Sequence, residues 1–572
     1  MTKNSSVYYL VKIDIGSKQK YIFSTNVLKD IIGASEIIRF ITEELGQTVL
    51  DYMNKFNICR SKFSKEAFNG IRGNVLIEAG GNSIYIFKEK EHAIKFNKIF
   101  SKFVMKYFDG IELLMVIQEF NIEKQIKLEE SPSIKYALDN IERKLTIKKG
   151  ERKNLFKRIS YGLTRICANT QKPAGYSDNN KERFISKESY DKQRFYKKLY
   201  DNDKNGLNEY YIDDENKFIC KIKKGKYSGN IKDTEFYYTT EVDELAGDID
   251  SKSYVGITCV DGNGMGEKIN SFYKDYRYCK EKSIKENNLK WIRKYRDLTQ
   301  KIKDNYEEAF NTTINVLCKN YDKYREAIFK DDKKIIPIRP IILAGDDITF
   351  ISNGKIAIEA TKIFAENITE KVVKFGEKNS NLTVSCGVAI VRKKYPFSRA
   401  VKLAGELEKS SKKKLKKVKE IYKNNNCKIN DIDASFIDWY IDRGNILEGI
   451  NEIRNKENLE LTARPYMISI NNVNNNFKKL DNFIGLGNNK NIFCYKFNYF
   501  YKVLDIVKGL NKNSNLKEFY RTMNKSEVNA NLFSIKYLIN KDFKINGLQE
   551  ENMRQVIYDV IECLDLYKEV EK

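Results

Sequence analysis

The chain has 572 residues, with 103 lysines and arginines against 78 aspartates and glutamates, so its formal net charge is +25. Several domains are expected, because single hydrophobic cores stop growing at about 250–300 residues. The single histidine, His92, excludes a histidine–aspartate metal nuclease and an HExxH zinc protease, since each needs several histidines. His92 follows a run of charged residues and is expected at the surface.

The ten cysteines form no CxxC pair, so no structural zinc is expected, and they fit a reducing compartment. No apolar signal region follows the first residues, and no run of about 18 apolar residues occurs, so we expect a cytoplasmic protein without a membrane span. The positive charge favours an anionic partner such as RNA or nucleotide phosphates. A coding bias toward A·T, which enriches lysine, asparagine and isoleucine together, explains the charge equally well.

Residues 1–128 predict the order strand, helix, strand, strand, helix, strand. The expected elements are a strand (7–13) that ends at Asp14, a helix (26–54), a hairpin around an Ala-Gly-Gly-Asn turn (74–78 and 83–87), a second helix (88–107) and a last strand (112–120). Residues 129–250 predict an intervening mixed domain, with a helix at 133–147 and polar stretches after it.

Residues 251–429 repeat the order of the first segment. The expected elements are a strand (254–260) that ends at Asp261, a long helical region (265–330), a hairpin around an Ala-Gly-Asp-Asp turn (338–343 and 348–351), a helix (355–378), a strand (382–391) and a last helix (397–422). Residues 430–572 predict a C-terminal helical domain, in which Leu532, Ile535, Leu538 and Ile539 have helical spacing.

The repeated order βαββαβ is the ferredoxin-like arrangement, so the expected fold class is α+β with two ferredoxin-like domains, an intervening mixed domain and a C-terminal helical domain. Asp14 aligns with Asp261, 247 residues later, and the turn 79–82 aligns with 344–347, 265 residues later. An inserted helical stretch in the second copy accounts for the difference of 18 residues. The alternative is two unrelated α/β segments.

The chemistry is expected at Asp261, Asp346 and Asp347. In a βαββαβ sheet the first strand is next to the hairpin, so the three carboxylates should lie at one edge. They would repel one another unless cations neutralise them, and Mg²⁺ (or Mn²⁺) is a hard cation that takes oxygen ligands and shares them with substrate phosphates. Two such ions would orient a 3′-hydroxyl and neutralise an α-phosphate and its pyrophosphate leaving group. The alternative for an isolated Gly-Asp-Asp sequence is an ordinary turn.

Two further sequences suit phosphate groups. The glycines of Asp261-Gly262-Asn263-Gly264-Met265-Gly266 leave backbone N–H groups available at the start of a helix, although a packing role is the alternative. Gly345 allows a tight turn and close approach of phosphates. Residues 409–419 hold seven lysines in eleven positions, which is typical of either a nucleic-acid track or a solvated helix face.

The sequence resembles the large palm-domain subunit of type III CRISPR effector complexes, a two-palm protein related to GGDEF-type nucleotidyl cyclases. The resemblance rests on the Asp261–Gly266 loop and the Gly-Asp-Asp hairpin, and it extends to shorter matches at Tyr21-Ile22-Phe23, Gly33-Ala34-Ser35, Ser385-Cys386-Gly387-Val388-Ala389, Leu403-Ala404 through Ser411-Lys412, Phe436-Ile437-Asp438 and Arg464-Pro465-Tyr466.

The resemblance implies conversion of ATP to cyclic oligoadenylate, a second messenger in antiviral defence. It implies that Asp261, Asp346 and Asp347 hold metal, and that ATP is bound by the loop glycines with Asn263, by Gly345 and by Lys412, which would contact the triphosphate. A second ATP would lie against the first palm, near Ser35, Gly80, Gly81 and Asn82. That palm is degenerate, because Gly81 and Asn82 replace the acidic pair. RNA and other CRISPR effector subunits are the implied partners.

Three departures from the family's pattern affect these expectations. The chain starts at the first palm, without the family's frequent nuclease domain, so DNA cleavage by that route is not expected. The family's zinc-binding cysteines are absent between the palms, and Ala344 replaces the first glycine of Gly-Gly-Asp-Asp. A non-catalytic RNA-binding scaffold subunit is the alternative function, a templated polymerase is less favoured, and GTP stays open as a substrate.

Overall fold

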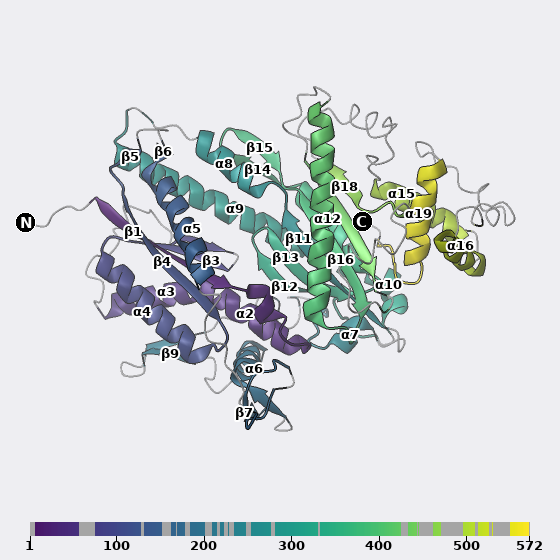
Figure 1. Ribbon diagram of the computed structural model, residues 1–572, viewed down its shortest axis with the longest axis horizontal. Helices are drawn as coiled ribbons and strands as arrows, with labels where there is room; N and C mark the ends of the chain where they lie inside the picture. The colour runs from purple at the N-terminus through teal and green to yellow at the C-terminus, as the bar shows by residue number, and fades with distance from the viewer. Residues whose placement is uncertain are drawn as a thin grey trace, which may run out of the picture.

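We describe the protein from a computed structural model. The described residues are 6–56, 75–79, 81–126, 131–151, 162–167, 169–177, 183–200, 209–213, 218–221, 227, 231, 234–247, 253–275, 279, 281–329, 332–424, 433–442, 444, 461–470, 496–509, 513–525, 529 and 550–570. They form a mixed α+β protein in which two sheets lie along the long axis and a group of C-terminal helices follows the second sheet (Figure 1). None of the described helices combines the length and apolar character that crossing a bilayer requires.

The first sheet has four antiparallel strands in the order β2-β3-β1-β4. The strands are β1 (Val7–Gly16), β2 (Val75–Ala79), β3 (Asn82–Phe87) and β4 (Glu112–Asn121). The helices of this segment are α1 (Lys18–Ile22), α2 (Leu28–Glu43), α3 (Leu45–Lys55) and α4 (Lys90–Tyr107). Helices follow β1 and β3 and a hairpin joins β2 to β3, so the segment has the expected βαββαβ order.

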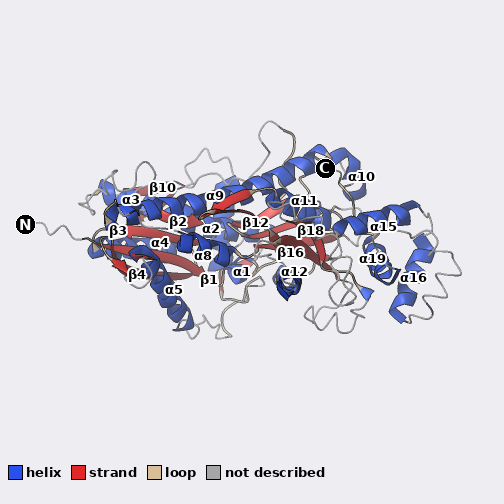
Figure 2. Cartoon of the chain, turned by 90° about the horizontal axis from the view of Figure 1, so that it is seen from above, coloured by secondary structure: helices blue, strands red, loops and turns tan. Residues whose placement is uncertain are grey.

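The second sheet begins with the same strand order, β12-β13-β11-β16, and continues with two more strands, β17 and β18. Its strands are β11 (Tyr254–Gly262), β12 (Ile338–Ala344), β13 (Asp347–Asn353), β16 (Val384–Arg392), β17 (Ala434–Ile441) and β18 (Tyr466–Ile470). Its helices are α8 (Met265–Asp275), α9 (Ile284–Lys319), α10 (Tyr321–Ile328), α11 (Ala357–Thr369) and α12 (Phe397–Asn424). Figure 2 shows α9 and α11 on one side of these strands and α12 on the other.

A β-bulge recurs at the same place in both sheets. In β2 the register shifts between Val75 and Ile77, and in β12 it shifts between Pro340 and Ile342. Each bulge lies three residues before the alanine that closes the hairpin, Ala79 or Ala344. Because bulges are specific features of a strand pair, their shared position supports an internal duplication.

Two expectations, one for residues 251–429 and one for residues 430–572, are wrong. The helix expected at 355–378 ends at Thr369, and a hairpin of β14 (Val372–Phe375) and β15 (Lys378–Asn381) follows it. The β-branched pair at 372–373 and the turn at Gly376, which has a φ of 64°, favour strands there. Residues 434–441 and 466–470, expected in a helical domain, are the strands β17 and β18, and β17 is buried along its whole length.

The remaining described elements are short strands and helices outside the two sheets. Between the sheets lie β5 (Gln125–Ile126), β6 (Ser131–Pro132), α5 (Ser133–Glu151), β7 (Ala174–Ser177), β8 (Phe184–Ser186), α6 (Lys187–Tyr200), β9 (Glu209–Asp213), β10 (Phe218–Lys221) and α7 (Val242–Ala246). After them come α15 (Phe497–Gly509), α16 (Asn513–Lys525) and α19 (Glu550–Cys563). The four residues of helical spacing at 532–539 lie outside the described residues.

The two sheets are joined by a shared core and by polar contacts. Each of the two buried apolar clusters contains residues of both sheets. The Ser35 hydroxyl donates a hydrogen bond to the carbonyl of Ile341, which the bulge in β12 leaves outside the strand ladder. Lys303 of α9 pairs with Glu43 of α2 at 2.9 Å. These contacts hold the first sheet in a defined position beside the second.

His92 is 7% exposed, so the expectation of a surface histidine is wrong. It lies in the first turn of α4, on the face that also buries Ala93 and Phe96. Its ring is 3.5 Å from the carboxylate of Glu89. The charged neighbours in sequence point elsewhere on the helix, and helical periodicity turns His92 toward the core.

A buried charge network attaches the C-terminal helix α19 to the second sheet. Arg464 pairs with Asp559 at 3.0 Å and with Glu562 at 2.9 Å, and it donates a hydrogen bond to the carbonyl of Trp439 at 2.8 Å. Tyr466 donates to Asp559 at 2.9 Å. All three charged side chains are at most 3% exposed, so each depends on the others for neutralisation.

We predict that Arg464→Ala lowers the free energy of unfolding by about 3–5 kcal/mol, because it leaves two buried carboxylates without their cation. Urea denaturation measures the effect. Arg521→Ala is the matched control, because its ion pair with Glu518 is exposed and should contribute only about 0–1 kcal/mol. Equal losses in the two variants would show that the buried network does not hold α19 in place.

Candidate active site

Asp261, Asp346 and Asp347 lie at one edge of the second sheet, as the sequence predicts. β11 and β13 are neighbours, with Val260 opposite Ile348, so the next positions place Asp261 opposite Asp347. Ala344 pairs with Asp347 and closes a two-residue turn of Gly345 and Asp346. Gly345 has a φ of 71°, a conformation that favours glycine, and this turn brings Asp346 to the same edge.

Gly262 packs directly against Asp346. A Cβ at Gly262 would lie 2.9 Å from the Cβ of Asp346 and 2.7 Å from the hydroxyl oxygen of Tyr306. Tyr306 comes from α9 and is buried, and its hydroxyl has no hydrogen-bond partner among the described residues. Only glycine fits at position 262 with Asp346 in this place, so the loop after β11 and the hairpin are matched to each other.

The carboxylates of the hairpin lack full neutralisation. Burial raises the pKa of Asp346. The pKa of Asp347 is raised by the surrounding protein and then by the charge of Asp346, and Lys18 opposes this rise. Asp347 lines the cavity described below, and its side chain is exposed to solvent there. Protein surrounds its carboxylate on the other sides. The pair therefore favours a bound cation.

Asp261 is paired with a lysine. The Lys412 ammonium forms an ion pair with the Asp261 carboxylate and lies 3.0 Å from Glu408, one helical turn earlier on α12. Burial raises the pKa of Glu408 to about 7. Lys412 is thus placed at the aspartate edge, as the sequence predicts, and a contact with a triphosphate stays a prediction.

Within the described residues, no three His, Cys, Asp or Glu side chains are grouped closely enough to hold a metal ion. The three aspartates share an edge, but the Asp261 carboxylate is directed to Lys412 rather than to the hairpin pair. Their donor chemistry nevertheless fits Mg²⁺ or Mn²⁺, because all of the donors are carboxylate oxygens and two of them repel each other. Their role as metal ligands stays a prediction.

The loop after Asp261 is held from inside the protein. The Asn263 side chain is buried, accepts a hydrogen bond from Ser385 at 2.7 Å and donates to the carbonyl of Ala434 at 3.0 Å. Its amide therefore fixes the loop on β16 and β17 and is not directed at a ligand. Gly264 has a φ of 63° and precedes α8. Among the described residues, a Cβ there would meet only the Glu267 carboxylate, at 3.9 Å, so the backbone is accessible to a phosphate.

A cavity of about 560 Å³ lies beside these aspartates. Asp261 and Asp347 line it from the second sheet, and α12 contributes residues including Lys402 and Lys409. Gln19, Lys20 and Phe23 line it from the N-terminal segment. Residues about 240–390 positions apart thus form one concave site, in the size range of ligand pockets.

The residues of the first segment that are predicted to lie near a second ATP have different surroundings from one another. The Ser35 hydroxyl is used in the contact with Ile341, and Gly80 lies outside the described residues. Gly81 has a φ of 76°, and Asn82 is opposite Asp14, as Asp347 is opposite Asp261 in the second sheet. Of the three positions equivalent to Asp261, Asp346 and Asp347, the first sheet therefore has a carboxylate only at Asp14.

The sequence analysis missed Lys18. This residue begins α1, lies 3.7 Å from the Asp14 carboxylate and interacts electrostatically with Asp347. Lys149 of α5 also pairs with Asp14, at 2.5 Å. Burial lowers the pKa of Lys18, against the raising effect of the two aspartates. Its spacing of four residues from Asp14 was the available signal, but only the tertiary structure brings it to Asp347.

Residues 254–421 match the family model for the second palm domain of Cas10/Cmr2. Over these residues the chain is similar to the second palm domain of that family. The match covers the strand of Asp261, the hairpin of Asp346 and Asp347, and the helix of Lys412, and it confirms the family resemblance seen in the sequence. Among curated proteins, no sequence matches the chain.

Several solved structures are similar to the chain. The apo Csm1–Csm4 cassette has 13% identity and a TM-score of 0.47, covering 99% of this chain and 70% of that chain. The same cassette in complex with cA4 has 13% identity and a TM-score of 0.45, covering 99% and 71%. The Csm1–Csm4 subcomplex of the type III-A CRISPR–Csm interference complex has 13% identity and a TM-score of 0.44, covering 98% and 70%.

We predict that Gly262→Ala costs about 1–3 kcal/mol of stability, because its Cβ would overlap Asp346 and the Tyr306 hydroxyl. Adding Tyr306→Phe should recover part of the loss, since it removes the closest contact. Urea denaturation of both variants measures this. Gly266→Ala, where a Cβ would meet nothing within 4 Å, is the control. A Gly262→Ala protein as stable as Gly266→Ala would contradict the tight packing of the loop on the hairpin.

Proposed function

We propose that the protein is a metal-dependent nucleotidyltransferase that converts ATP to cyclic oligoadenylate, within a CRISPR-type defence system. The observation that carries this proposal is the aspartate edge of a Cas10/Cmr2 second palm domain, with Asp261 opposite Asp347 and Asp346 packed on Gly262. The family resemblance of the sequence supplies the product class. The same resemblance implies a relation to GGDEF-type nucleotidyl cyclases, which also supports nucleotidyl transfer.

In this proposal Asp261, Asp346 and Asp347 hold Mg²⁺ or Mn²⁺, which supplies charge neutralisation at the α-phosphate and orients a 3′-hydroxyl when bound. Lys412 is positioned to leave Asp261 and contact the triphosphate, since its ammonium is at the aspartate edge. The Gly264 backbone and the start of α8 offer N–H groups to phosphates. The Asn263 side chain orients this loop through Ser385 and Ala434.

We further propose that residues 1–128 are a degenerate first palm that binds the second ATP. Its sheet has the strand order of the second palm and the same bulge, and Gln19, Lys20 and Phe23 line the cavity beside Asp347. Asp14 is held by Lys18 and Lys149, so this edge is suited to binding phosphate rather than metal. The other domains are placed at 129–250, 251–429 and 430–572, with the sheet of the second palm extending past 429 through β17 and β18.

The alternative function is a non-catalytic scaffold subunit that binds RNA. Four of the seven lysines at 409–419 are exposed on α12, namely Lys409, Lys413, Lys416 and Lys417, and together with the charge of +25 they favour an anionic partner. A scaffold has no need of two aspartates whose pKa values are both raised by burial, with that of Asp347 raised further by Asp346, because unneutralised carboxylates destabilise the fold. We therefore favour the enzyme, with RNA and effector subunits as partners.

We predict that Asp346→Ala with Asp347→Ala lowers the initial rate at saturating ATP roughly a thousandfold or more, because phosphoryl transfer depends on charge neutralisation. Asn82→Ala, at the place equivalent to Asp347, should raise the ATP concentration for half-maximal rate and leave the maximal rate nearly unchanged. Initial rates against ATP concentration, with products identified by mass and folding checked by circular dichroism, separate these effects. Excess EDTA should stop the wild type. A folded Asn82→Ala protein that is inactive at saturation would place the chemistry in the first palm.

A pH dependence follows from the raised pKa values of Asp346 and Asp347. Metal binding requires both carboxylates deprotonated, so protons compete with metal at a higher pH than for an exposed aspartate. As the pH is lowered, Mn²⁺ affinity should therefore begin to fall at a pH above the usual aspartate range near 3.8. Electron paramagnetic resonance of free Mn²⁺ measures this. An affinity that stays constant down to about pH 4 would contradict the proposed ligands.

A further inference from the structure

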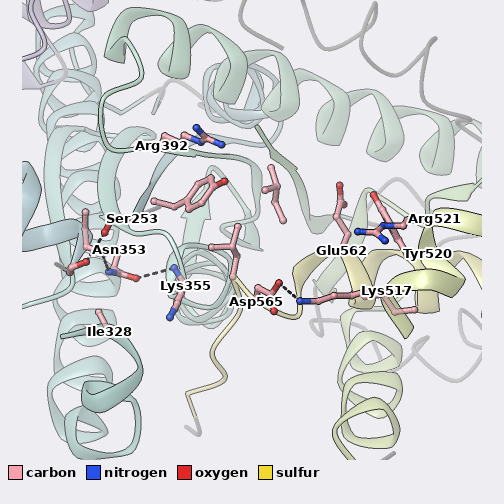
Figure 3. Close-up of a pocket in the computed structure, with 16 residues that line it drawn as sticks. Ser253, Ile328, Asn353, Lys355, Arg392, Lys517, Tyr520, Arg521, Glu562 and Asp565 are labelled. Carbon is pink, nitrogen blue, oxygen red and sulfur yellow. Dashed lines mark hydrogen bonds and ion pairs between the residues drawn. The ribbon is translucent and has the colours of Figure 1, made fainter. Parts of the chain in front are cut away.

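A second cavity, of about 710 Å³, lies at the opposite edge of the second sheet. Figure 3 shows Ser253, Asn353 and Lys355 on one side of it and Lys517, Arg521 and Asp565 on the other. The first side belongs to the palm domain and the second to the C-terminal helices. Ligand pockets occur preferentially at such boundaries between domains, and this volume is within their usual range of about 300–1,000 Å³.

The strand ends place this cavity away from the aspartate edge. Tyr254 begins β11 and pairs with Arg392, which ends β16, and Asn353 ends β13. Asp261 lies seven residues further along β11, so about 23 Å of strand separate the two edges at about 3.3 Å per residue. Contacts in this cavity are therefore independent of the residues that we assign to catalysis.

The lining of the cavity has an excess of positive charge. Four cationic side chains, Lys355, Arg392, Lys517 and Arg521, face two carboxylates, Glu562 and Asp565, so the difference, 4 − 2, is +2. Both carboxylates already have cations, since Glu562 pairs with Arg464 at 2.9 Å and Asp565 pairs with Lys517 at 2.8 Å. The lining residues Lys355, Arg392 and Arg521 therefore carry positive charge that no carboxylate of the lining neutralises.

Two of these cations lack a carboxylate partner in the described part of the chain. Lys355 donates from its ammonium to the carbonyl of Ala327 at 2.8 Å and forms no ion pair. Arg392 is exposed and forms no ion pair within the same residues. Arg521 has only a long, exposed contact with Glu518 at 3.3 Å. An anionic ligand in the cavity could therefore contact these cations without first breaking a buried ion pair.

The rest of the wall is fixed and includes aromatic rings. Asn353 donates to the carbonyls of Leu245 and Ala246, at 3.1 and 2.9 Å, so its amide is used in holding the wall. Tyr254 lines the palm side, and Tyr520 lines the helical side, where it stacks on Tyr558 with ring centroids 4.5 Å apart. The cavity thus combines available cations with flat apolar surfaces, the two features that recognise phosphate and a planar base.

We propose that this cavity binds a phosphorylated ligand of nucleotide size, with Arg392 and Lys355 contacting its phosphates and the tyrosines its planar part. Arginine presents a fork of donors that matches phosphate oxygens, which suits Arg392 for the principal contact. Such a ligand would touch both the palm domain and α16, and so it would stabilise the attachment of the C-terminal helices to the sheet.

Amide hydrogen exchange, read by mass spectrometry on the full chain, tests the proposal by locating the ligand. The probes are ATP, inorganic triphosphate and adenosine. ATP should slow exchange in peptides covering 353–357 and 513–525, and Arg392→Gln with Lys355→Gln should weaken this protection roughly tenfold or more in ATP concentration, as expected for losing contacts to charged groups. Lys394→Gln with Lys525→Gln is the matched control, because both lysines are exposed, Lys394 follows Arg392 by two residues and Lys525 ends α16, and neither lines the cavity.

Protection by triphosphate alone would identify phosphate as the recognised group, and protection by ATP alone would show that the nucleoside contributes. Protection by adenosine but not by triphosphate would overturn the proposal, as would ATP protection confined to peptides around 261–266. Protection that persists in the double variant, or that is lost equally in the control, would also overturn it. Arg392→Gln alone preserves the contact of Lys355 with Ala327 and replaces the double variant if circular dichroism shows that the latter is unfolded.

Discussion

Repulsion among carboxylates at one edge of a sheet is the constraint around which the second palm domain is arranged. Asp346 raises the pKa of Asp347, and burial raises both, so the hairpin exists in a state that a cation would stabilise. The surrounding elements supply positive charge to this edge. Lys412 of α12 pairs with Asp261, and Lys18 of α1 acts on Asp347. Two lysines that are 394 positions apart in the chain thus partly offset three aspartates.

The position of Lys18 depends on how the two sheets are joined. The bulge in β12 turns the Ile341 carbonyl out of the ladder, and Ser35 binds it, so an irregularity in one sheet becomes a contact with the other. Lys303 and Glu43 connect α9 to α2 on the same boundary. The cavity beside Asp347 is therefore formed by both segments, and the N-terminal segment contributes to the site although it has a single carboxylate at its own edge.

The opposite edge of the second sheet is organised by charge as well, but in a buried form. Arg464, Asp559 and Glu562 attach α19 to the strands through contacts that exclude water. This attachment borders the cavity between the palm domain and the C-terminal helices, where Lys355 and Arg392 have no carboxylate partner among the described residues. One sheet thus has two edges of opposite character, an acidic one with lysines around it and a basic one with its carboxylates already neutralised.

The sequence by itself determined the local elements and the residues of the aspartate edge. Strand periodicity located β1, β11 and both hairpins, and the duplication placed Asp14 with Asp261, because alternating and helical patterns are local properties of the chain. It could not show that 434–441 and 466–470 continue the sheet, since fully buried strands have no alternation to distinguish them from buried helices. It also could not find Lys18, Tyr306 or the orientation of Asn263. Each of these depends on contacts between residues tens to hundreds of positions apart, and only the tertiary structure decides such contacts, because packing and burial, not local pattern, choose the partners.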